Sequence, residues 1–192
     1  MDGKIFFIMG VSGAGKGTLI ENLKKLHNDR FYFPLSYKSR QIRETETNGV
    51  DAWFITRSEF EKSIKNGEFL EYAKVYGLDD YYGTKYNDVI ENGVKKGKMV
   101  IKEVDMEGLL ILKKDKPELS EFYKTIFLTI PLELQIERIK SRGAYMSEIE
   151  LEERKKTAIR EKEEAIKNCD YIIDTGGKSK EKVLEEVLKI II

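Results

Sequence analysis

Short apolar runs alternate with segments of helical periodicity along most of the chain. The first run, Lys4–Met9, is rich in aromatic and β-branched residues, which predicts a buried parallel strand. Leu19, Leu23 and Leu26 then recur at helical spacing, so a helix is predicted to begin near Lys16. Strands that alternate with helices indicate an α/β fold, in which a parallel sheet is covered on both faces.

The same alternation continues in the second half of the chain. Strands are predicted at Met99–Val104, Lys124–Ile130 and Tyr171–Asp174. Helices are predicted at Asn87–Lys96, Met106–Lys114, Pro131 to about Lys140, Ser147–Asn168 and Ser179 to the C-terminus.

The segment from Ser36 to about Gly83 has a different pattern, with polar stretches, Gly/Asn turns and many tyrosines. One short helix is predicted at Thr56–Lys65 with Ser58 as its cap, followed by a strand at Phe69–Tyr76. We therefore expect a core formed by residues 1–35 and 85–192 and an inserted α+β lobe at residues 36–84.

Composition excludes several classes of protein. Lys plus Arg and Asp plus Glu both number 34, and this zero net charge argues against a histone-like nucleic-acid binder or a polybasic membrane-surface protein. One cysteine and one histidine leave no intramolecular disulfide and no cluster of thiolate or imidazole metal ligands. The N-terminus lacks the pattern of a signal peptide, so a cytoplasmic location is expected.

The strongest local signal is the segment GVSGAGKGT, which matches G-x-x-x-x-G-K and lies between the predicted strand and helix. Glycines let backbone N–H groups turn inward around a phosphate, the helix adds its positive end, and Lys16 supplies an ammonium for the outer phosphates. A plain strand-to-helix turn is the alternative, and the flanking elements argue against it. The predicted ATP-binding residues are Gly10, Ser12, Gly13, Ala14, Gly15, Lys16, Gly17 and Thr18.

The strict pattern has Ser or Thr directly after the lysine, where this chain has Gly17. In many phosphate-loop proteins that hydroxyl coordinates Mg²⁺, and a glycine cannot. Either Thr18 has another task, such as contacting an inner phosphate, or Mg²⁺ is held largely through water.

The GxxGxGKGT form is that of nucleoside monophosphate kinases, and later segments resemble the guanylate kinase family. The matching segments are SYKSRQIR at residues 36–43, Glu46, NGVDAWF at 48–54, FLEYA at 69–73, YYGT at 81–84, EVDMEG at 103–108, Arg138, SRG at 141–143 and Arg154. The match is collinear from about Lys4 to Ile173. It implies a three-layer core of the P-loop NTPase type, an inserted nucleoside-monophosphate-binding lobe and a helical lid at about residues 138–156.

The resemblance implies an acceptor site for GMP. Its residues would be Ser36, Arg40, Arg43, Glu71, Tyr82, Thr84 and Asp105. Arg40 and Arg43 would hold the acceptor phosphate, to which Tyr82 would donate its hydroxyl proton. Carboxylates such as Glu71 and Asp105 would face the N–H donors of guanine, and adenine would leave them unpaired because it has no donors there.

The resemblance also implies the catalytic set Lys16, Arg138, Arg142 and Arg154, whose positive charges would neutralise the transferred phosphoryl group. Glu103 matches a carboxylate near the metal and its waters. ATP and Mg²⁺ are the implied donor and cofactor. This set is chemically coherent, since phosphoryl transfer needs positioning and positive charge more than a nucleophilic side chain.

The sequence departs from the family pattern around the acceptor. A phosphate-binding tyrosine is replaced by Ala52, and the Thr-Thr before Arg40 is Lys38-Ser39, which could add compensating charge. The link at residues 78–80 is longer than usual, and so is the lid between Arg142 and Arg154. The late strand ends in Asp-Thr-Gly at residues 174–176, where the family often has Asn for the donor base.

The sequence thus predicts an enzyme that moves the γ-phosphoryl group of ATP to GMP or dGMP, in purine nucleotide metabolism. A related kinase acting on another phosphorylated acceptor, such as a ribose bisphosphate, is the first alternative. A non-catalytic scaffold domain is the second. Small-molecule nucleotides are the expected partners, without nucleic acid or membrane, and the chain is expected to be a monomer or homodimer.

Overall fold

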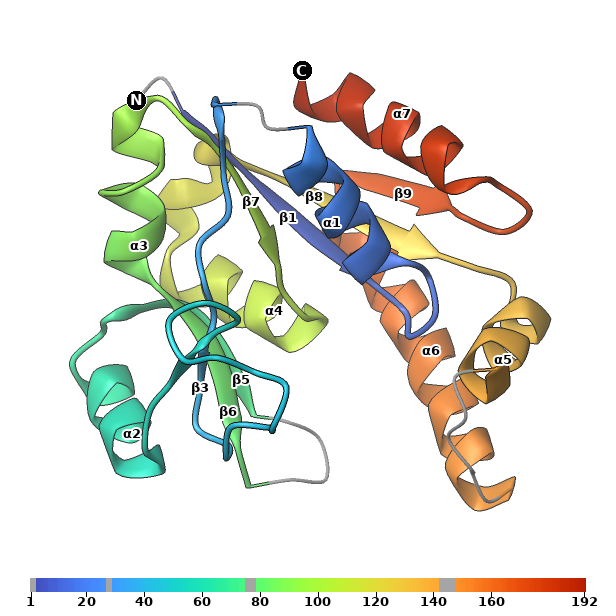
Figure 1. Cartoon of the computed structure of the whole chain (residues 1–192), viewed down its shortest axis with the longest axis horizontal. Helices are drawn as coiled ribbons and strands as arrows, with labels where there is room; N and C mark the ends of the chain where they lie inside the picture. Colours follow the sequence, from blue (N-terminus) through green and yellow to red (C-terminus); the bar gives the residue numbers. More distant parts are fainter. Residues whose placement is uncertain (1–2, 27–28, 75–78, 142–147) are drawn as a thin grey trace. The chain divides into compact units, whose positions relative to one another are not determined.

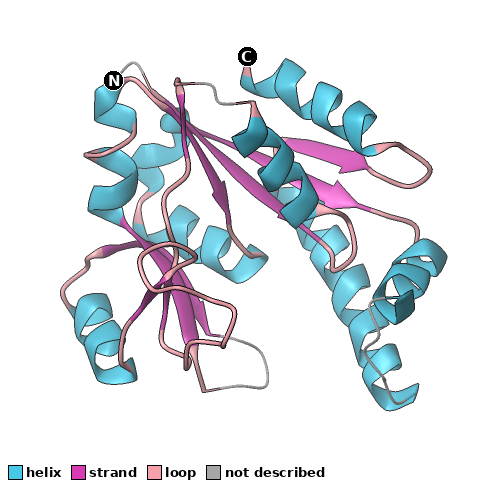
Figure 2. Cartoon of the chain, viewed as in Figure 1, coloured by secondary structure: helices cyan, strands magenta, loops and turns pink. Residues whose placement is uncertain are grey.

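The computed structural model describes residues 3–26, 29–74, 79–141 and 148–192 (Figure 1). The chain divides into two units, each with its own strands and helices (Figure 2). Unit 1 comprises Met1–Ile5 and Asp29–Tyr123, and unit 2 comprises Phe6–Asn28 and Lys124–Ile192. The expected boundaries of the lobe, residues 36–84, and of the lid, residues 138–156, stay predictions.

The larger sheet has five strands in the order β2-β7-β1-β8-β9. Their bounds are Lys4–Gly10 for β1, Phe31–Tyr32 for β2, Met99–Glu103 for β7, Tyr123–Thr129 for β8 and Tyr171–Asp174 for β9. Strands β2 and β7 pair in parallel, as do β8 and β9. Residues 5–9 of β1 are at most 2% exposed, as expected for a strand of a parallel sheet that is covered on both faces. The predicted α/β class with a parallel sheet is confirmed.

Four helices belong to unit 2: α1 (Lys16–Lys25), α5 (Leu132–Ser141), α6 (Glu148–Asn168) and α7 (Lys180–Ile191). Helices α1 and α7 contact each other, and Leu23 and Val187 on them are fully buried. The hydroxyl of Ser179 accepts a hydrogen bond from the Lys182 amide and so caps the start of α7. Ser147, where α6 was predicted to begin, lies outside the described residues.

A four-stranded sheet in unit 1 has the order β4-β3-β6-β5. Its strands are β3 (Tyr37–Lys38), β4 (Trp53–Phe54), β5 (Phe69–Lys74) and β6 (Tyr81–Lys85). Strand β3 pairs in parallel with β4 and antiparallel with β6, so that Lys38 lies opposite both Phe54 and Tyr82. Strand β5 pairs antiparallel with β6, which sets Glu71 opposite Thr84.

The helices of unit 1 are α2 (Arg57–Lys65), α3 (Tyr86–Ile90) and α4 (Met106–Asp115), with 3₁₀ segments at Val94–Lys96 and Pro117–Phe122. The ring of Phe60 on α2 is fully buried and stacks on Phe69, with ring centroids 4.3 Å apart. This aromatic contact fixes α2 against the four-stranded sheet.

Two details of the predicted helices were wrong. Thr56, not Ser58, caps α2, because the Thr56 hydroxyl accepts from the Glu59 amide while the Glu59 carboxylate accepts from the Thr56 amide. The helix predicted at Asn87–Lys96 is two separate pieces, since Gly93 has a non-helical backbone. Within the described parts of the chain, no helix is both long enough and apolar enough to cross a bilayer.

Leu23 tests the packing of α1. Leu23→Ala should lower the free energy of unfolding by about 3 kcal/mol, because it removes a fully buried side chain and leaves a cavity. Leu26, at the end of the same helix, is 45% exposed, so Leu26→Ala should cost less than about 1 kcal/mol. Urea denaturation of both variants measures the difference, and equal losses would contradict this account of the packing.

Candidate active site

The loop between β1 and α1 has the geometry of an anion cradle. A Cβ at Gly10 would collide with the carbonyl oxygen of Leu128, so the loop can begin this close to β8 only with glycine. Gly15 has a φ of 91°, in the left-handed region, and occupies the capping position of α1. Because glycine has no side chain to cap the helix, the first N–H groups of α1 remain available to an anion.

The ammonium of Lys16 turns back onto this loop. It donates to the carbonyl oxygens of Gly10 at 2.6 Å and of Val11 at 3.3 Å. These neutral acceptors hold the charge at the loop without cancelling it. A bound phosphate would offer Lys16 a stronger, charged acceptor at the same place.

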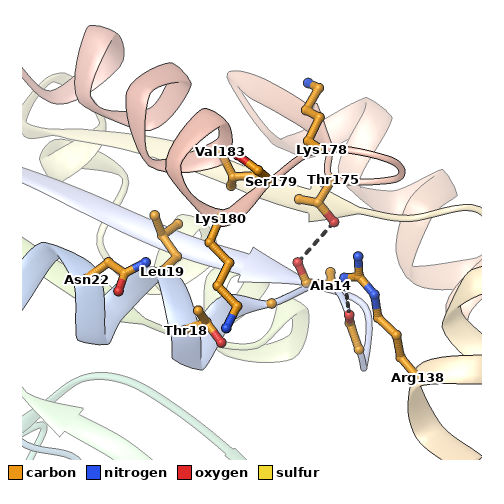
Figure 3. A pocket seen from close by; sticks show the side chains of 12 residues that line it. Ala14, Thr18, Leu19, Asn22, Arg138, Thr175, Lys178, Ser179, Lys180 and Val183 are labelled. Carbon is orange, nitrogen blue, oxygen red and sulfur yellow. Dashed lines mark hydrogen bonds between the residues drawn. The ribbon is translucent and has the colours of Figure 1, made fainter. Parts of the chain in front are cut away.

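A cavity of about 370 Å³ adjoins the loop within unit 2 (Figure 3). Its lining is Gly13, Ala14, Gly15, Thr18, Leu19, Asn22, Arg138, Thr175, Lys178, Ser179, Lys180 and Val183. Arg138 donates to the carbonyl oxygen of Gly13 at 3.0 Å, and the Thr175 hydroxyl donates to that of Ala14 at 3.1 Å. Apolar walls from Leu19 and Val183 beside a phosphate loop suit the base and ribose of a nucleotide.

A second cluster lies on one face of the four-stranded sheet of unit 1. Because side chains alternate along a strand, Tyr82 and Thr84 on β6 share a face. Cross-strand pairing adds Lys38 from β3 beside Tyr82 and Glu71 from β5 beside Thr84. On this face, the row formed by Lys38 and Tyr82 therefore carries a cationic and a hydroxyl group, and the next row, formed by Glu71 and Thr84, carries a carboxyl group.

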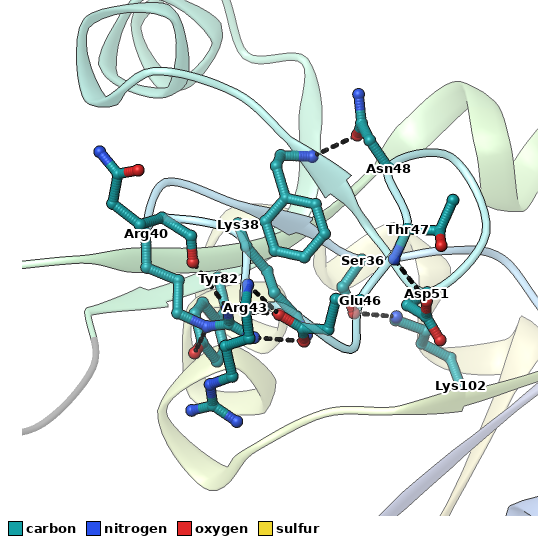
Figure 4. A network of polar contacts seen from close by, with 12 residues as sticks. Ser36, Lys38, Arg40, Arg43, Glu46, Thr47, Asn48, Asp51, Tyr82 and Lys102 are labelled. Atoms are coloured by element: carbon teal, nitrogen blue, oxygen red, sulfur yellow. Dashed lines mark hydrogen bonds and ion pairs between the residues drawn. The ribbon is translucent and has the colours of Figure 1, made fainter.

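Arg40 is fixed by four side-chain hydrogen bonds, one of them to the carbonyl oxygen of Gln41 at 2.8 Å (Figure 4). It donates to the Glu46 carboxylate through Nη1 at 2.6 Å and Nη2 at 2.5 Å, and through Nε to the Tyr82 hydroxyl at 2.8 Å. The bidentate guanidinium lowers the pKa of Glu46 to about 2. Since the Tyr82 oxygen accepts from Arg40, its own proton is free to be donated to a ligand.

The carboxyl group of Glu71 is buried, with 5% of the residue exposed. Burial raises its pKa to about 7, and the nearby charge of Asp105 acts in the same direction. The Thr84 hydroxyl, which donates to Oε1 at 2.5 Å, and the positive charge of Lys102 lower the pKa and offset part of that rise. A Cβ at Gly108 would lie 2.5 Å from Oε2, so α4 approaches the carboxylate closely only because it has glycine there.

Lys102 on β7 is a further charged group close to Glu71 and is only 5% exposed. Its ammonium donates to the Ser36 hydroxyl oxygen and, at 3.3 Å, to the carbonyl oxygen of Pro34. Because Ser36 accepts this bond, its own proton can be donated to an acceptor on a ligand. The arrangement therefore presents one hydroxyl donor and one carboxylate acceptor to the same ligand.

Comparison with known proteins identifies the fold and the relatives of this chain. The guanylate kinase family model matches residues 2–191. The chain belongs to the guanylate kinase family. The guanylate kinase of Clostridium tetani is 42% identical over 73% of this chain, and the alignment covers 62% of that protein's own length. The guanylate kinase of Carboxydothermus hydrogenoformans is 38% identical over 88% of this chain and 77% of its own.

A solved structure agrees with the fold. The crystal structure of guanylate kinase from Anaplasma phagocytophilum superimposes with a TM-score of 0.69, at 24% identity over 98% of this chain and 84% of the other. At this identity the likeness concerns the fold alone, which is of the P-loop NTPase type.

Within unit 1, the structure brings together most of the residues that the guanylate kinase resemblance assigns to the acceptor site. Arg40 bonds Tyr82, Glu71 bonds Thr84, and Asp105 caps α4 by accepting from the Gly108 amide at 2.8 Å. In unit 2, Lys16 and Arg138 both bond carbonyls of the phosphate loop. The roles of these residues stay predictions.

Four other predicted residues of the guanylate kinase site are exposed or lie outside the described residues. Arg43 and Glu103 are exposed in unit 1, and Arg154 is exposed on α6. Arg142 lies outside the described residues. Among the described residues, no group of three or more His, Cys, Asp or Glu side chains could hold a metal ion, so the predicted Glu103 would contribute a single carboxylate.

Sequence reasoning missed two residues of the acceptor cluster. Glu46 was matched to the guanylate kinase pattern but given no role, although it holds both Arg40 and the Arg43 amide. Lys102 was taken as part of a strand. A lysine inside the apolar run MVIKEV was the available signal, since a charge there must find partners if it is buried.

The pH dependence of stability tests the burial of Glu71. Its pKa is raised in the folded protein, so its contribution is fully present below the unfolded value of 4.5 and is lost as pH rises through about 7. Glu71→Gln removes this effect, so its unfolding free energy relative to the wild type should rise by up to about 3 kcal/mol from pH 5 to pH 8. Urea denaturation at the two pH values measures it.

Glu68→Gln is the matched control. Hydrogen bonding by Lys85 lowers the pKa of Glu68 to about 2, so its contribution is present above 4.5 and nearly constant from pH 5 to pH 8. The stability difference between this variant and the wild type should therefore be the same at both pH values. A parallel response of the two variants would contradict the assignment to Glu71.

Proposed function

We propose that this protein transfers the γ-phosphoryl group of ATP to GMP or dGMP, forming ADP and GDP or dGDP, in purine nucleotide metabolism. The observation that carries the proposal is the buried Glu71 carboxyl, held beside Thr84 and one row away from Arg40 and Tyr82. The curated relatives cited above are named guanylate kinase, which supports the same reaction.

The acceptor base would be recognised by complementary hydrogen bonding. Guanine offers N1–H and amino N–H donors, which Glu71 and Asp105 would accept. The Ser36 proton, left free because Ser36 accepts from Lys102, would be donated to an acceptor on the base. Adenine has no N1–H donor and no amino group at C2, so the buried carboxylate would gain no hydrogen bond beyond the one from Thr84.

The acceptor phosphate would bind on the adjoining row of the same face. Arg40 and Arg43 would donate to its oxygens, and the proton of Tyr82 is available for a third bond. Glu46 holds Arg40 in place before the ligand arrives, which reduces the ordering needed on binding.

The donor would bind at the phosphate loop and in the adjoining cavity of unit 2. Backbone N–H groups of Gly13–Thr18 and the ammonium of Lys16 would hold the outer phosphates, and the base would occupy the space lined by Leu19 and Val183. In transfer, an oxygen of the GMP phosphate attacks the γ-phosphorus, and the bond to the β–γ bridging oxygen breaks to release ADP. Lys16, Arg138, Arg142 and Arg154 would neutralise the charge on the phosphoryl group as it moves.

The residues of the chain fit a weakly ligated Mg²⁺. Gly17 offers no hydroxyl after Lys16, and Glu103 supplies one carboxylate, so most ligands would be water and phosphate oxygens, as Mg²⁺ commonly has. When bound, the ion would neutralise phosphate charge and orient the donor.

We further propose that the enzyme acts on free nucleotides in the cytoplasm, as a monomer or homodimer, without nucleic acid or membrane. Its equal numbers of basic and acidic residues support the absence of nucleic-acid binding. A ribose bisphosphate acceptor is not favoured, because it has no N–H donors to add to the single hydroxyl, from Thr84, that donates to the buried Glu71 carboxyl.

A panel of acceptors tests the substrate. ADP release coupled to a spectroscopic assay should be fast with GMP and dGMP, and slower by about a hundredfold or more with AMP, UMP and ribose phosphates, because only guanine satisfies Glu71. IMP, which keeps the N1–H but lacks the amino group, should fall between. Turnover of another acceptor with GMP inert would overturn the proposal.

Lys16→Ala tests the donor site. The change should lower kcat by about a hundredfold or more, because it removes the positive charge nearest the transferred group. Lys25→Ala removes the same charge from the exposed end of α1 and should leave kcat unchanged. Unfolding curves of both variants should match the wild type. Near-normal turnover of Lys16→Ala would refute the role of the phosphate loop.

A further inference from the structure

Lys38 lies in the same cluster of unit 1 as Arg40 and Tyr82. On β3 it is opposite Tyr82 of one neighbouring strand and Phe54 of the other. Its ammonium is 5.5 Å from the centre of the Tyr82 ring and 5.6 Å from that of Phe54. The same two rings lie beneath the Arg40 guanidinium, at 5.9 Å and 5.3 Å (Figure 4). The two cations therefore lie over the same pair of aromatic rings.

The ammonium of Lys38 is poorly satisfied by its surroundings. Its side chain is only 18% exposed, and among the described residues its one hydrogen-bond partner is Glu46, at 3.4 Å. Glu46 already accepts two much shorter bonds from Arg40. A cation with three N–H donors, largely removed from water and holding one long bond, has donors to spare.

The charges of the cluster suggest what those donors bind. Lys38, Arg40 and Arg43 are linked through Glu46, which accepts from the first two side chains and from the Arg43 amide. Three cations and one anion leave a net charge of +2. A phosphate monoester carries close to −2 at neutral pH, because its second pKa is about 6. Without Lys38 the cluster would be one charge short.

We propose that Lys38 binds the acceptor phosphate directly, as a third cation beside Arg40 and Arg43; this inference rests on the proposed function. On binding, the ammonium exchanges its long bond to Glu46 for a phosphate oxygen, while Glu46 keeps Arg40 in place. The buried Ala52, which directly precedes β4, offers no hydroxyl to the phosphate. The contact from Lys38 therefore carries correspondingly more of the affinity.

The competing explanation is structural. Lys38 would then only offset the charge of Glu46 and cover the rings of Phe54 and Tyr82. That role affects the fold of the lobe and the binding of any ligand to it. A direct contact affects only ligands that carry the phosphate, so GMP and guanosine separate the two explanations.

The test is calorimetric titration of the full chain with GMP and with guanosine, without ATP. Lys38→Met should weaken GMP binding about tenfold and leave guanosine binding unchanged, because it removes one charged hydrogen bond to phosphate. Lys38→Arg keeps the charge and should bind GMP within about threefold of the wild type. Lys85→Met is the matched control, since Lys85 lies on the opposite face of β6, paired with Glu68 and over the Tyr37 ring; it should change neither affinity.

The outcomes are distinct. Equal weakening of GMP and guanosine by Lys38→Met, or no weakening of either, would overturn the inference while the wild type's binding of GMP leaves the proposed function intact. A wild-type protein that binds neither ligand would overturn the proposed function and the inference together. Weaker binding of GMP but not of guanosine, seen in Lys38→Met and absent in Lys38→Arg, would support the direct contact.

Discussion

The proposed acceptor site in unit 1 is organised around the carboxyl group of Glu71, which is buried. Burial of Glu71 disfavours its charged form, and two groups offset part of that cost: a hydroxyl from β6 and an ammonium from β7. The pKa nevertheless remains near 7. A ligand with N–H donors would supply the hydrogen bonds that the protein does not give to the Glu71 carboxylate. The same burial that costs stability can therefore select guanine.

Three cations of the two units show the opposite arrangement, since each donates to an acceptor of the protein. Lys16 and Arg138 bond neutral carbonyls of the phosphate loop, whereas Arg40 bonds a carboxylate. A carbonyl leaves the full positive charge available to polyphosphate. A carboxylate cancels part of it, but fixes the guanidinium more firmly, which suits recognition of one phosphate in one orientation. The two sites thus differ in rigidity as well as in charge.

How far the sequence predicts this structure depends on how local each feature is. The phosphate loop and the strands and helices beside it follow from glycines and periodicity within short windows. Strands β3 and β4 were not predicted, because two residues each are too few to show alternation and their partners are distant in the chain. The hydrogen-bond partner of the buried Lys102 could not be predicted either, since Ser36 lies 66 residues away in the chain.

A net charge of zero over the whole chain therefore says little about the sites. Two of the charges that would meet phosphate, on Lys38 and Arg40, are already paired with Glu46, and this pairing reduces the repulsion between them. An incoming dianion would not have to displace Glu46 from Arg40, because Lys38, whose bond to Glu46 is the longest of the cluster, can change partner first. The phosphate would therefore bind first by replacing Glu46 as the partner of Lys38, in the weakest ion pair of the cluster.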